Sequence, residues 1–492
     1  MGAAHHSADK TDKGVSVSLV ILGFAMIVTF MVLIMTKKLT PVVALILVPT
    51  IFGLFAGAGL GLGDMVMESV GKLAPTAALL MFAIIYFGIM IDVGLFDPLV
   101  RFILKVAGND PAKIVVGTAL LAGAVSLDGD GSTTFIVTTA ALLPIYLRLG
   151  MSPVVLTCVA GLANGTLNIV PWGGPTVRAA AALKVDASDI FVPMIPSLIA
   201  GLVIVFLFAW MLGLAERKRL GRFDSDGSSL GTDGTLAGTT FGRARGTTDT
   251  DDATPGSALA SSGVAVITQP IATAMSDTML DSDRSTLRPK LIWFNLALTL
   301  AVMTLLVLDL VPLFYVFMIG SAIALLVNFP KMKSQASEIV AHAPSVVGVV
   351  SMVLAAGVLI GVLDGTGMVD AMANWLVEVI PASMGPFLAV ITGLLSIPMT
   401  FFMSNDAFYF GILPVLSQSA ANFGIDPVEM ARASITGQPV HLQSPLVPAI
   451  LLLVSLANVN LGDHHKKVLW RAAIVSVVML VVGVLVGSIP WG

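Results

Sequence analysis

The sequence predicts an all-α polytopic membrane protein built from two repeats of inverted orientation. Hydrophobic residues fill 56% of the 492 positions and charged residues only 11%, and the mean hydropathy is +0.96. Soluble proteins carry about 25% charged residues, and one this apolar would expose large sticky patches. Long apolar stretches recur along the chain, and a set of marker residues returns at a nearly constant spacing. Lipid is therefore expected to solvate most of the surface.

Eight apolar stretches approach the length of about 20 residues that a helix needs to cross a bilayer. They cover residues 19–35, 42–60, 76–91, 190–214, 291–308, 313–327, 346–363 and 468–489. The first stretch has the position of a signal peptide. It lacks a small-residue cleavage site, however, and Lys37 and Lys38 follow it directly. We therefore expect it to be retained as the first helix.

The chain contains two similar halves, as its marker residues indicate. They return in the same order 270 to 274 residues later: Gly88, Gly94, Asp97, Ser126, Pro144, Pro153, Pro171 and Asp189 as Gly361, Gly367, Asp370, Ser396, Pro414, Pro427, Pro445 and Asp463. The first half then spans residues 19–215 and the second 291–490. An N-terminal tail, 1–18, precedes them, and a central segment, 216–290, separates them.

The central segment 216–290 differs in composition from both halves. It is rich in Gly, Ser, Thr and Asp, as in GRFDSDGSSLGTDGTLAGTTFGRARGTTDTDD. Such a segment cannot bury enough apolar area to offset the entropy lost on ordering. We expect it to be a disordered linker.

Each half is expected to hold about five transmembrane helices and one re-entrant hairpin. The hairpins are pairs of short apolar arms, 114–127 with 133–147 and 387–398 with 407–416. Because five crossings is an odd number, the second half must be inverted. Loops on the linker's side then hold most of the lysines and arginines, which places that side in the cytoplasm. We therefore expect a cytoplasmic linker, both termini outside and an extracellular tail at 1–18.

The sequence carries none of the common motifs of ATP-driven transport or hydrolysis. It has no Walker A lysine context, no HExxH among its six histidines, and no GxSxG serine with a triad. We expect no enzyme activity and no permanently bound cofactor, and an ion gradient as the energy source. The expected partner is the lipid bilayer, with no nucleic acid.

Polar residues at membrane depth are costly and usually functional. Here they gather at the two hairpin tips and at two interrupted helices, which break within 164–176 and 438–445. Glycine and proline at such breaks free backbone groups that can hold ions, so tips and breaks should converge on one central site. The candidate substrate ligands are Ser132, Thr133, Asn164, Thr166, Asn168, Thr176, Arg178, Ser404, Asn405, His441, Gln443 and Ser444. The candidates for proton coupling or metal binding are Asp128, Asp130 and Asp406.

Each candidate also has a plainer interpretation. Asp128 and Asp130 could end helix arms in a wetted turn, but two acids in a glycine-rich turn of an apolar hairpin favour a function. Arg178 could extend to the outer interface near Lys184 instead of binding a carboxylate. His441 could stabilise helix packing instead of contributing to the site. The sequence leaves the last two choices open.

Three segments carry a resemblance to a known family: SLDGDGSTTF, NGTLNIVPWGGPTVRAA and FFMSNDAFYFGILP. They resemble the citrate–metal:proton symporter family, within the ion transporter superfamily of elevator-type carriers, and the match covers both halves. Ser404-Asn405-Asp406, followed by Pro414, stands where the superfamily's dicarboxylate carriers have a Ser-Asn-Thr signature. The first half departs from that signature, with acids just before Thr134.

The resemblance implies a secondary transporter of the cell membrane that imports citrate complexed with a divalent metal such as Mg²⁺ or Ca²⁺, together with protons. It also implies a homodimer with fixed scaffold and moving transport domains. The chemistry agrees, because free citrate carries about three negative charges near neutral pH and is very costly to bury. Binding of a divalent cation reduces the charge of the complex to about one negative charge. The metal is then part of the cargo.

Other carriers and non-carriers would fit parts of the same pattern. A cation/proton antiporter would use the same acids without an organic anion. A sodium-coupled di- or tricarboxylate carrier would need sodium and no divalent metal. A sensor or structural membrane protein would bind without moving its ligand.

Overall fold

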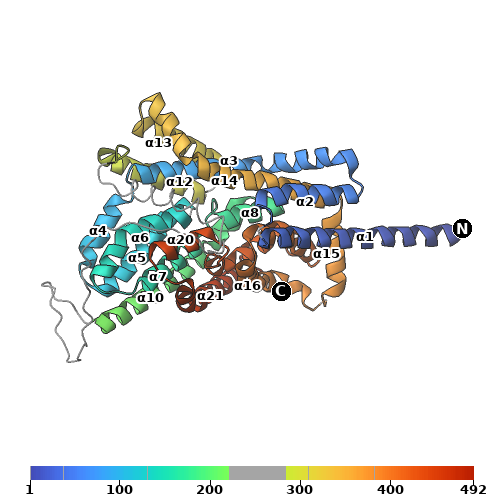
Figure 1. Ribbon diagram of the computed structural model, residues 1–492. Coiled ribbons are helices and arrows are strands. Elements are labelled where there is room, and N and C mark those ends of the chain that lie inside the picture. The colour runs from blue at the N-terminus through green and yellow to red at the C-terminus, as the bar shows by residue number, and fades with distance from the viewer. Residues whose placement is uncertain (1, 37, 130, 221–283, 309, 382) are drawn as a thin grey trace, which may run out of the picture.

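The computed structural model describes residues 2–36, 38–129, 131–220, 284–308, 310–381 and 383–492. Regular structure within these ranges is entirely helical, which confirms the expected class (Figure 1). By length and composition, seven described segments could cross a membrane: Gly59–Asp92, Pro111–Asp128, Ala187–Leu220, Pro289–Leu306, Met332–Gly365, Gly385–Phe402 and Leu461–Leu485. Five shorter apolar helices accompany them: Ser18–Ile34, Pro41–Phe55, Pro153–Leu167, Leu313–Asn328 and Ala407–Ala421.

The first half contains ten helices in the described residues. They are α1 (Gly2–Met35), α2 (Pro41–Phe55), α3 (Leu62–Asp92), α4 (Asp97–Ala107), α5 (Pro111–Val125), α6 (Gly131–Arg148), α7 (Pro153–Leu167), α8 (Gly174–Leu183), α9 (Ala187–Phe191) and α10 (Ile195–Leu220). Proline begins α5 and α7, because its fixed φ suits a first turn and its missing N–H needs no partner there. Asp110 caps α5 by accepting a hydrogen bond from Ala112 N at 3.0 Å.

The second half repeats this order of elements. It contains α12 (Ile292–Leu308), α13 (Leu313–Asn328), α14 (Met332–Gly365), α15 (Met368–Val379), α16 (Leu388–Phe402), a π-helical turn (Ala407–Ile412), α17 (Leu413–Ala421), α18 (Pro427–Ser434), α19 (Gln438–His441), α20 (Pro448–Leu456) and α21 (Leu461–Leu485). As in the first half, two apolar helices precede a helix of more than 30 residues, a short helix and a pair of arms. Two similar halves would give such a shared order. The repeat and the opposite orientation of its halves in a membrane both stay predictions.

The third helices of the two halves, α3 in the first and α14 in the second, lie side by side through the molecule (Figure 1). Their backbones approach closely at two of the recurring glycines. A Cβ added to Gly88 would lie 2.4 Å from the His342 ring, and one added to Gly361 would lie 2.6 Å from the Met65 carbonyl oxygen. No larger side chain fits there without displacement, so these recurring glycines serve helix packing.

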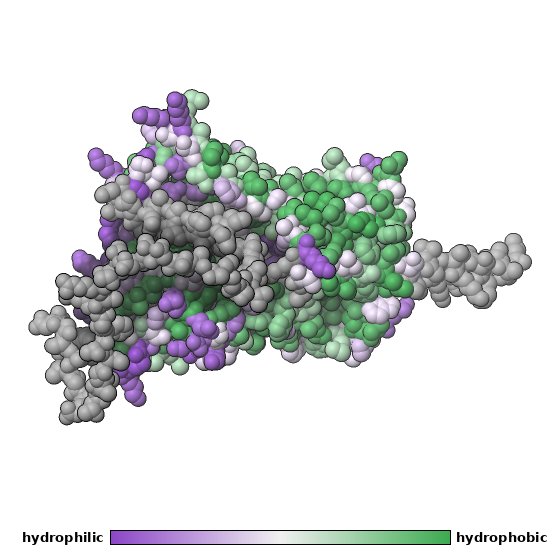
Figure 2. Space-filling model, in the orientation of Figure 1, coloured by the Kyte–Doolittle hydropathy of each residue, from purple (hydrophilic) through white to green (hydrophobic). Residues whose placement is uncertain are grey.

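The molecular surface suits a lipid environment over a broad area. Figure 2 shows hydrophobic side chains across much of the visible face around α2 and the adjoining ends of α3 and α14. On α2 alone, large apolar side chains are exposed at Val43, Ile46, Leu47, Ile51, Leu54 and Phe55. In water such a face would associate with other apolar surfaces, whereas in lipid it is the stable arrangement.

Both ends of the segment 216–290 are structured, which corrects the boundaries expected for the linker. Helix α10 continues to Leu220. At the other end, Arg284 donates hydrogen bonds to carbonyl groups at the end of α3 and to the Asp97 carboxylate at 3.2 Å. These contacts hold the chain before α12. Residues 221–283 lie outside the described part, so their disorder stays a prediction.

The two predicted pairs of arms form helix pairs whose tips hold polar residues. Helices α5 and α6 contact each other, as do α16 and α17. At the first tip, a 3-10 turn (Ser126–Asp128) ends at Gly129, whose φ of 77° lies in the left-handed region that favours glycine. At the second tip, α16 extends four residues beyond the predicted arm, to Phe402. A π-helical turn then starts the return arm.

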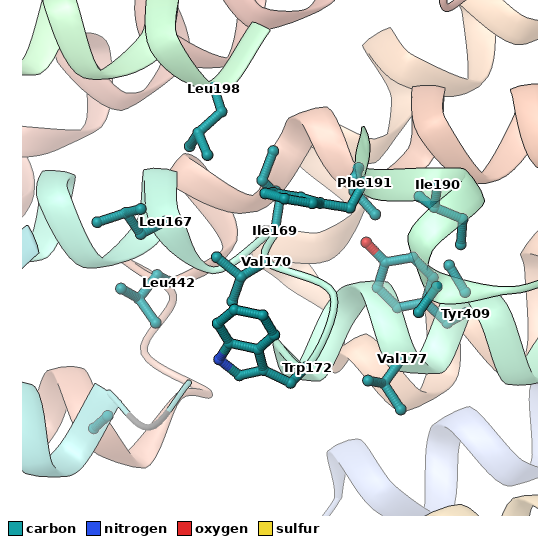
Figure 3. Packing of buried hydrophobic residues seen from close by; sticks show 14 of the residues in the cluster. Leu167, Ile169, Val170, Trp172, Val177, Ile190, Phe191, Leu198, Tyr409 and Leu442 are labelled. Carbon is teal, nitrogen blue, oxygen red and sulfur yellow. The ribbon is translucent and has the colours of Figure 1, made fainter. Parts of the chain in front are cut away.

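The break between α7 and α8 is packed into the hydrophobic core. Trp172 lies at the centre of this packing (Figure 3) and is 5% exposed. Its ring stacks on Phe87 of α3 at a centroid distance of 5.6 Å and meets Phe317 of α13 edge-on at 5.1 Å. The interrupted backbone is thus held against α3 and α13.

Candidate functional site

The first tip is tied to the first interrupted helix by side-chain hydrogen bonds. Asn164 of α7 donates to the Ser126 hydroxyl at 2.8 Å and to the Thr134 hydroxyl at 3.4 Å. Trp172 Nε1 donates to the carbonyl of Leu127 at 2.7 Å. These bonds hold the tip against the break. Of the two tip acids, Asp128 is buried beside Ser126, whereas Asp130 lies outside the described residues.

The first break owes its shape to a glycine and to a threonine hydroxyl. A Cβ added to Gly173 would lie 2.3 Å from the Asn168 carbonyl oxygen, so this turn excludes any other residue. Thr176 donates to the carbonyl of Ile169 at 2.7 Å and satisfies one group of the unwound backbone. Thr166 donates to Leu162 O one turn back in α7. The Thr176 hydroxyl therefore stabilises the break, whereas the Thr166 hydroxyl is bonded within α7.

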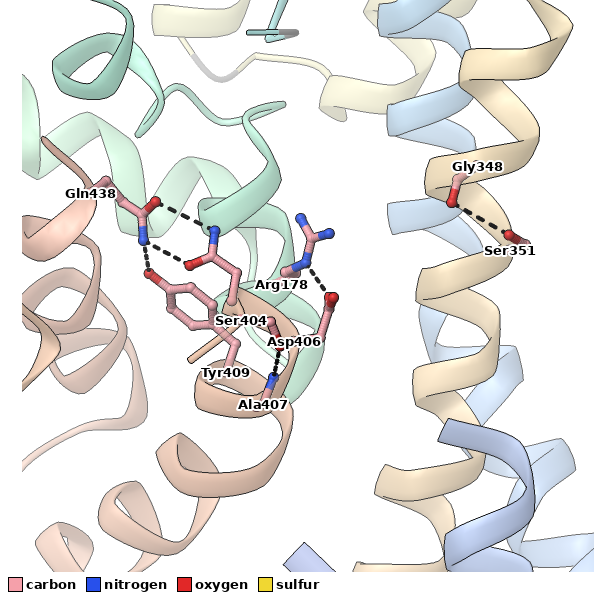
Figure 4. A network of polar contacts seen from close by, with 9 residues as sticks. Arg178, Gly348, Ser351, Ser404, Asp406, Ala407, Tyr409 and Gln438 are labelled. Carbon is pink, nitrogen blue, oxygen red and sulfur yellow. Dashed lines mark hydrogen bonds and ion pairs between the residues drawn. The ribbon is translucent and has the colours of Figure 1, made fainter. Parts of the chain in front are cut away.

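The second tip faces the first half through a buried ion pair. Arg178 Nε of α8 donates to Asp406 Oδ1 at 2.6 Å, and the two side chains are 16% and 8% exposed (Figure 4). The pair joins residues 228 positions apart. This geometry shows that Arg178 points into the protein toward the second tip rather than outward to an interface. Its charge and that of Asp406 balance each other.

A chain of amides extends this contact. Gln438, at the start of α19, exchanges hydrogen bonds with the Asn405 amide at 3.2 and 3.5 Å. Its Nε2 also donates to the Tyr409 hydroxyl at 2.9 Å (Figure 4), and its Oε1 accepts from Asn168 at 3.4 Å. Residues of both halves thus meet in one network, which includes the candidates Asn168, Arg178, Asn405 and Asp406.

Gln438 and Tyr409 connect the network but are absent from the ligands expected from the sequence. Gln438 is a glutamine before a proline inside an apolar helix, and this burial of an amide is the signal that could have found it. Tyr409 is fully buried and reads as a core aromatic. Only the fold shows that its hydroxyl lies next to Gln438.

The second break is held by its own polar side chains. His441 Nδ1 lies 2.5 Å from the carbonyl oxygen of Thr400, and the Ser444 hydroxyl donates to Phe401 O at 2.6 Å. Gln443 donates to Gly161 O of α7 at 3.0 Å. All of these contacts go to main-chain carbonyls near α16 and α7. In this structure His441, Gln443 and Ser444 position the break.

Gln443 also leads to two histidines that the sequence reasoning missed. Its Oε1 lies 3.1 Å from His464 Nε2, and its main-chain oxygen lies 2.8 Å from His465 Nε2. The other nitrogen of His464, Nδ1, lies 3.1 Å from the Thr157 hydroxyl. The start of α21 is thereby tied to the second break.

Burial separates the fourteen candidates that the structure describes into two groups. The partly exposed ones are Ser132, Asn168, Arg178, Ser404 and Asn405. The buried ones are Asp128, Thr133, Asn164, Thr166, Thr176, Asp406, His441, Gln443 and Ser444. The first group is in part accessible to solvent in this structure, and the second is not. The arrangement offers hydroxyls, amides and one guanidinium, which are suitable partners for carboxylates.

No candidate aspartate belongs to a ready metal site in the described ranges. Asp406 is engaged with Arg178. The one group there of three or more side chains of the Asp, Glu, His or Cys type with converging ligand atoms lies elsewhere, between α3 and α14. Most of the oxygen ligands of a hard cation such as Mg²⁺ would therefore have to come from a bound solute or from water, and not from the protein.

Comparisons with known proteins place the chain among transporters. A family model described as "Citrate transporter" matches residues 14–437. A Bacillus subtilis protein named "Citrate transporter" is 47% identical over 473 residues, which cover 96% of this chain and 100% of the relative. Another from that organism, "Mg(2+)/citrate complex secondary transporter", is 45% identical over 472 residues, 96% of this chain and 99% of the relative.

The fold also resembles that of a solved transporter structure. The Alcanivorax borkumensis YdaH transporter, whose report describes an unusual topology, superimposes with a TM-score of 0.53 at 15% sequence identity. The match covers 88% of this chain and 90% of that chain.

Proposed function

Because this chain belongs to the citrate transporter family, a family of membrane transporters and not of enzymes, we propose that it imports citrate complexed with a divalent metal, coupled to protons. The relative named for an Mg²⁺/citrate complex supports Mg²⁺ as one metal that can accompany citrate here. The metal is cargo in this proposal, and no permanent cofactor takes part.

The charge of the site supports a complexed substrate rather than free citrate. Citrate with about three negative charges would meet one guanidinium, that of Arg178, in a largely buried setting. Its desolvation would be poorly offset. A metal complex carries about one negative charge, which one arginine can balance. The hydroxyls and amides of Ser132, Asn168, Ser404 and Asn405 would serve its remaining carboxylate oxygens.

The ion pair between Arg178 and Asp406 is the observation that carries the proposal. Without substrate, the guanidinium is occupied by the Asp406 carboxylate at 2.6 Å. A citrate carboxylate that binds Arg178 must displace Asp406, which would leave a buried negative charge without its partner. A buried carboxylate in that position takes up a proton. Substrate and proton therefore bind together.

This linkage operates in both directions. If citrate binding favours protonation of Asp406, protonation of Asp406 favours citrate binding by the same factor. A carrier with this property moves both together or neither. Its accumulation of citrate then follows the proton gradient.

The metal itself would be held mainly by citrate and by tip groups of the first half. The side-chain oxygen of Asn164 is buried and accepts no hydrogen bond in the described part of the chain. Together with Asp128 on the neighbouring tip, it could complete the oxygen shell of a bound cation.

Labelled-citrate uptake into proteoliposomes tests the proposal when the metal and the ion gradient are varied independently. We expect accumulation only with Mg²⁺ or another divalent metal present and with an inward proton gradient. Accumulation under a sodium gradient without divalent metal would identify a sodium-coupled carboxylate carrier. Metal–proton exchange without citrate would identify a cation/proton antiporter.

Topology and assembly complete the proposal. Both termini lie outside the cell and the central linker in the cytoplasm, on the strength of the distribution of lysines and arginines. The resemblance to elevator-type carriers supports a homodimer in the cell membrane.

A further inference from the structure

A cluster of three ligand-type side chains lies where α3 ends and α14 begins, outside the site described above. Asp92 is the last residue of α3, and Glu338 and His342 lie one turn apart on α14. One ligand atom from each lies within 4.8 Å of the others, and His342 Nε2 is 3.1 Å from Asp92 Oδ2. Residues four apart share a helix face, so both α14 side chains point at Asp92.

The charge of this cluster is unbalanced. Glu338 is only 8% exposed, and none of the described lysines or arginines forms an ion pair with it. The nearby Arg284 is bound to the Asp97 carboxylate and to main-chain carbonyls. Arg288 attracts Glu338 by its charge, but its side chain donates to Asn328 O and forms no ion pair with that carboxylate. Two carboxylates close together repel each other unless a proton or a cation lies between them.

The packing of α3 against α14 does not require this cluster. The offset of 273 residues that relates Gly88 to Gly361 also relates Met65 to Glu338 and Ser69 to His342. At that other crossing, Gly361 packs against Met65 and Ser69 without any charged group. The same helix contact is therefore made once with apolar and small residues and once with a carboxylate and an imidazole.

We propose that Asp92, Glu338 and His342 bind a divalent transition metal ion, Zn²⁺ or Mn²⁺, that joins α3 to α14. One imidazole nitrogen and two carboxylate oxygens form a ligand set that these ions accept. Metal–ligand distances of about 2.0–2.2 Å put the ligand atoms of a tetrahedral site about 3.4 Å apart. His342 Nε2 and Asp92 Oδ2, 3.1 Å apart, already lie near that spacing. This resident metal is separate from the metal that travels with citrate.

Metal titration of the purified full-length protein tests this site in the absence of citrate, which would chelate the metal. After dialysis against EDTA, we expect the wild type to bind one equivalent of Zn²⁺ or Mn²⁺ and to melt at a higher temperature with it. Glu338→Gln, which keeps the side-chain shape, and His342→Asn should each weaken binding at least tenfold and abolish the rise in melting temperature. Glu378→Gln removes an exposed acid of α15 and should behave as the wild type.

Two outcomes would overturn the proposal. In the first, the wild type binds no metal and melts at a lower temperature than Glu338→Gln. This result would mean that the carboxylates of Asp92 and Glu338 share a proton instead of a metal. The other is equal metal affinity in the wild type and both variants. Either result is independent of citrate uptake, so a failure of this site and a failure of the transport proposal are told apart.

Discussion

Replacing Asp406 with asparagine separates substrate binding from proton coupling. In the wild type, metal–citrate has to displace Asp406 from Arg178, whereas in Asp406→Asn the guanidinium has no ionic partner. Breaking a buried ion pair of this kind costs about 3–5 kcal/mol, because the remaining charge stays buried. The pair here has an N–O distance of 2.6 Å and exposures of 16% and 8%, so it belongs to that class.

We expect the substrate-free variant to melt at a lower temperature, since Arg178 is left unpaired. Metal–citrate restores a partner, so binding should tighten. A gain of about 1.4 to 3 kcal/mol corresponds to about 10- to 100-fold in affinity. Binding should no longer depend on pH near neutrality. Accumulation under a proton gradient should disappear, while exchange of labelled for unlabelled citrate continues.

The assays are equilibrium binding of labelled citrate with Mg²⁺ at pH 6 and pH 8, counterflow, and uptake driven by a proton gradient. Asp364→Asn is the matched control, because Asp364 pairs with Lys184 of the other half while both side chains are 37–39% exposed. Loss of an exposed pair costs about 0–1 kcal/mol. Proton-driven accumulation at the wild-type rate in Asp406→Asn would refute the assignment of Asp406.

Three further changes test the fold and its orientation. Gly173→Ala should lower the yield of folded protein or abolish transport, because its Cβ would lie 2.3 Å from a carbonyl oxygen; Gly63→Ala, with no atom within 4 Å, should be neutral in the same melting and uptake measurements. Deletion of residues 224–253 should leave melting temperature and uptake unchanged, and loss of inserted protein would show that this segment folds or docks. A cysteine placed at Ser228 should resist impermeant reagents in intact cells, and labelling from outside would reverse the proposed topology.

The helical class and the order of elements are predictable from the sequence because both follow from local rules. Apolar runs near 20 residues predict membrane helices, and the recurring Pro153 and Pro427 begin corresponding helices, α7 and α18. The linker boundaries were harder to place. Arg284 looks like a solvated linker residue until the fold brings Asp97 to it.

The meeting of the tips with the breaks could be predicted at the level of segments, whereas the individual contacts could not. Arg178 and Asp406 could be identified as candidates because burying a charged side chain at membrane depth costs free energy. Their pairing across 228 positions, however, depends on how the two halves pack. His441 illustrates the opposite case. Its chemistry suggests a ligand, whereas its nearest acceptor is a main-chain carbonyl, which no sequence pattern reports.

The network between the two halves constrains how such a carrier can move. Rocking of one half against the other around a fixed site is a common scheme for repeat-built transporters. Here it would part α8 from the second tip and pull Asn168 from Gln438 at every cycle, whereas the exchange of Asp406 for citrate on Arg178 needs only a local shift of side chains. A body that keeps these elements together has to combine α8 of one half with the second tip and α19 of the other. The boundary of the moving part therefore cuts across both halves of the chain, and a covalent link between α8 and the second tip should leave turnover intact.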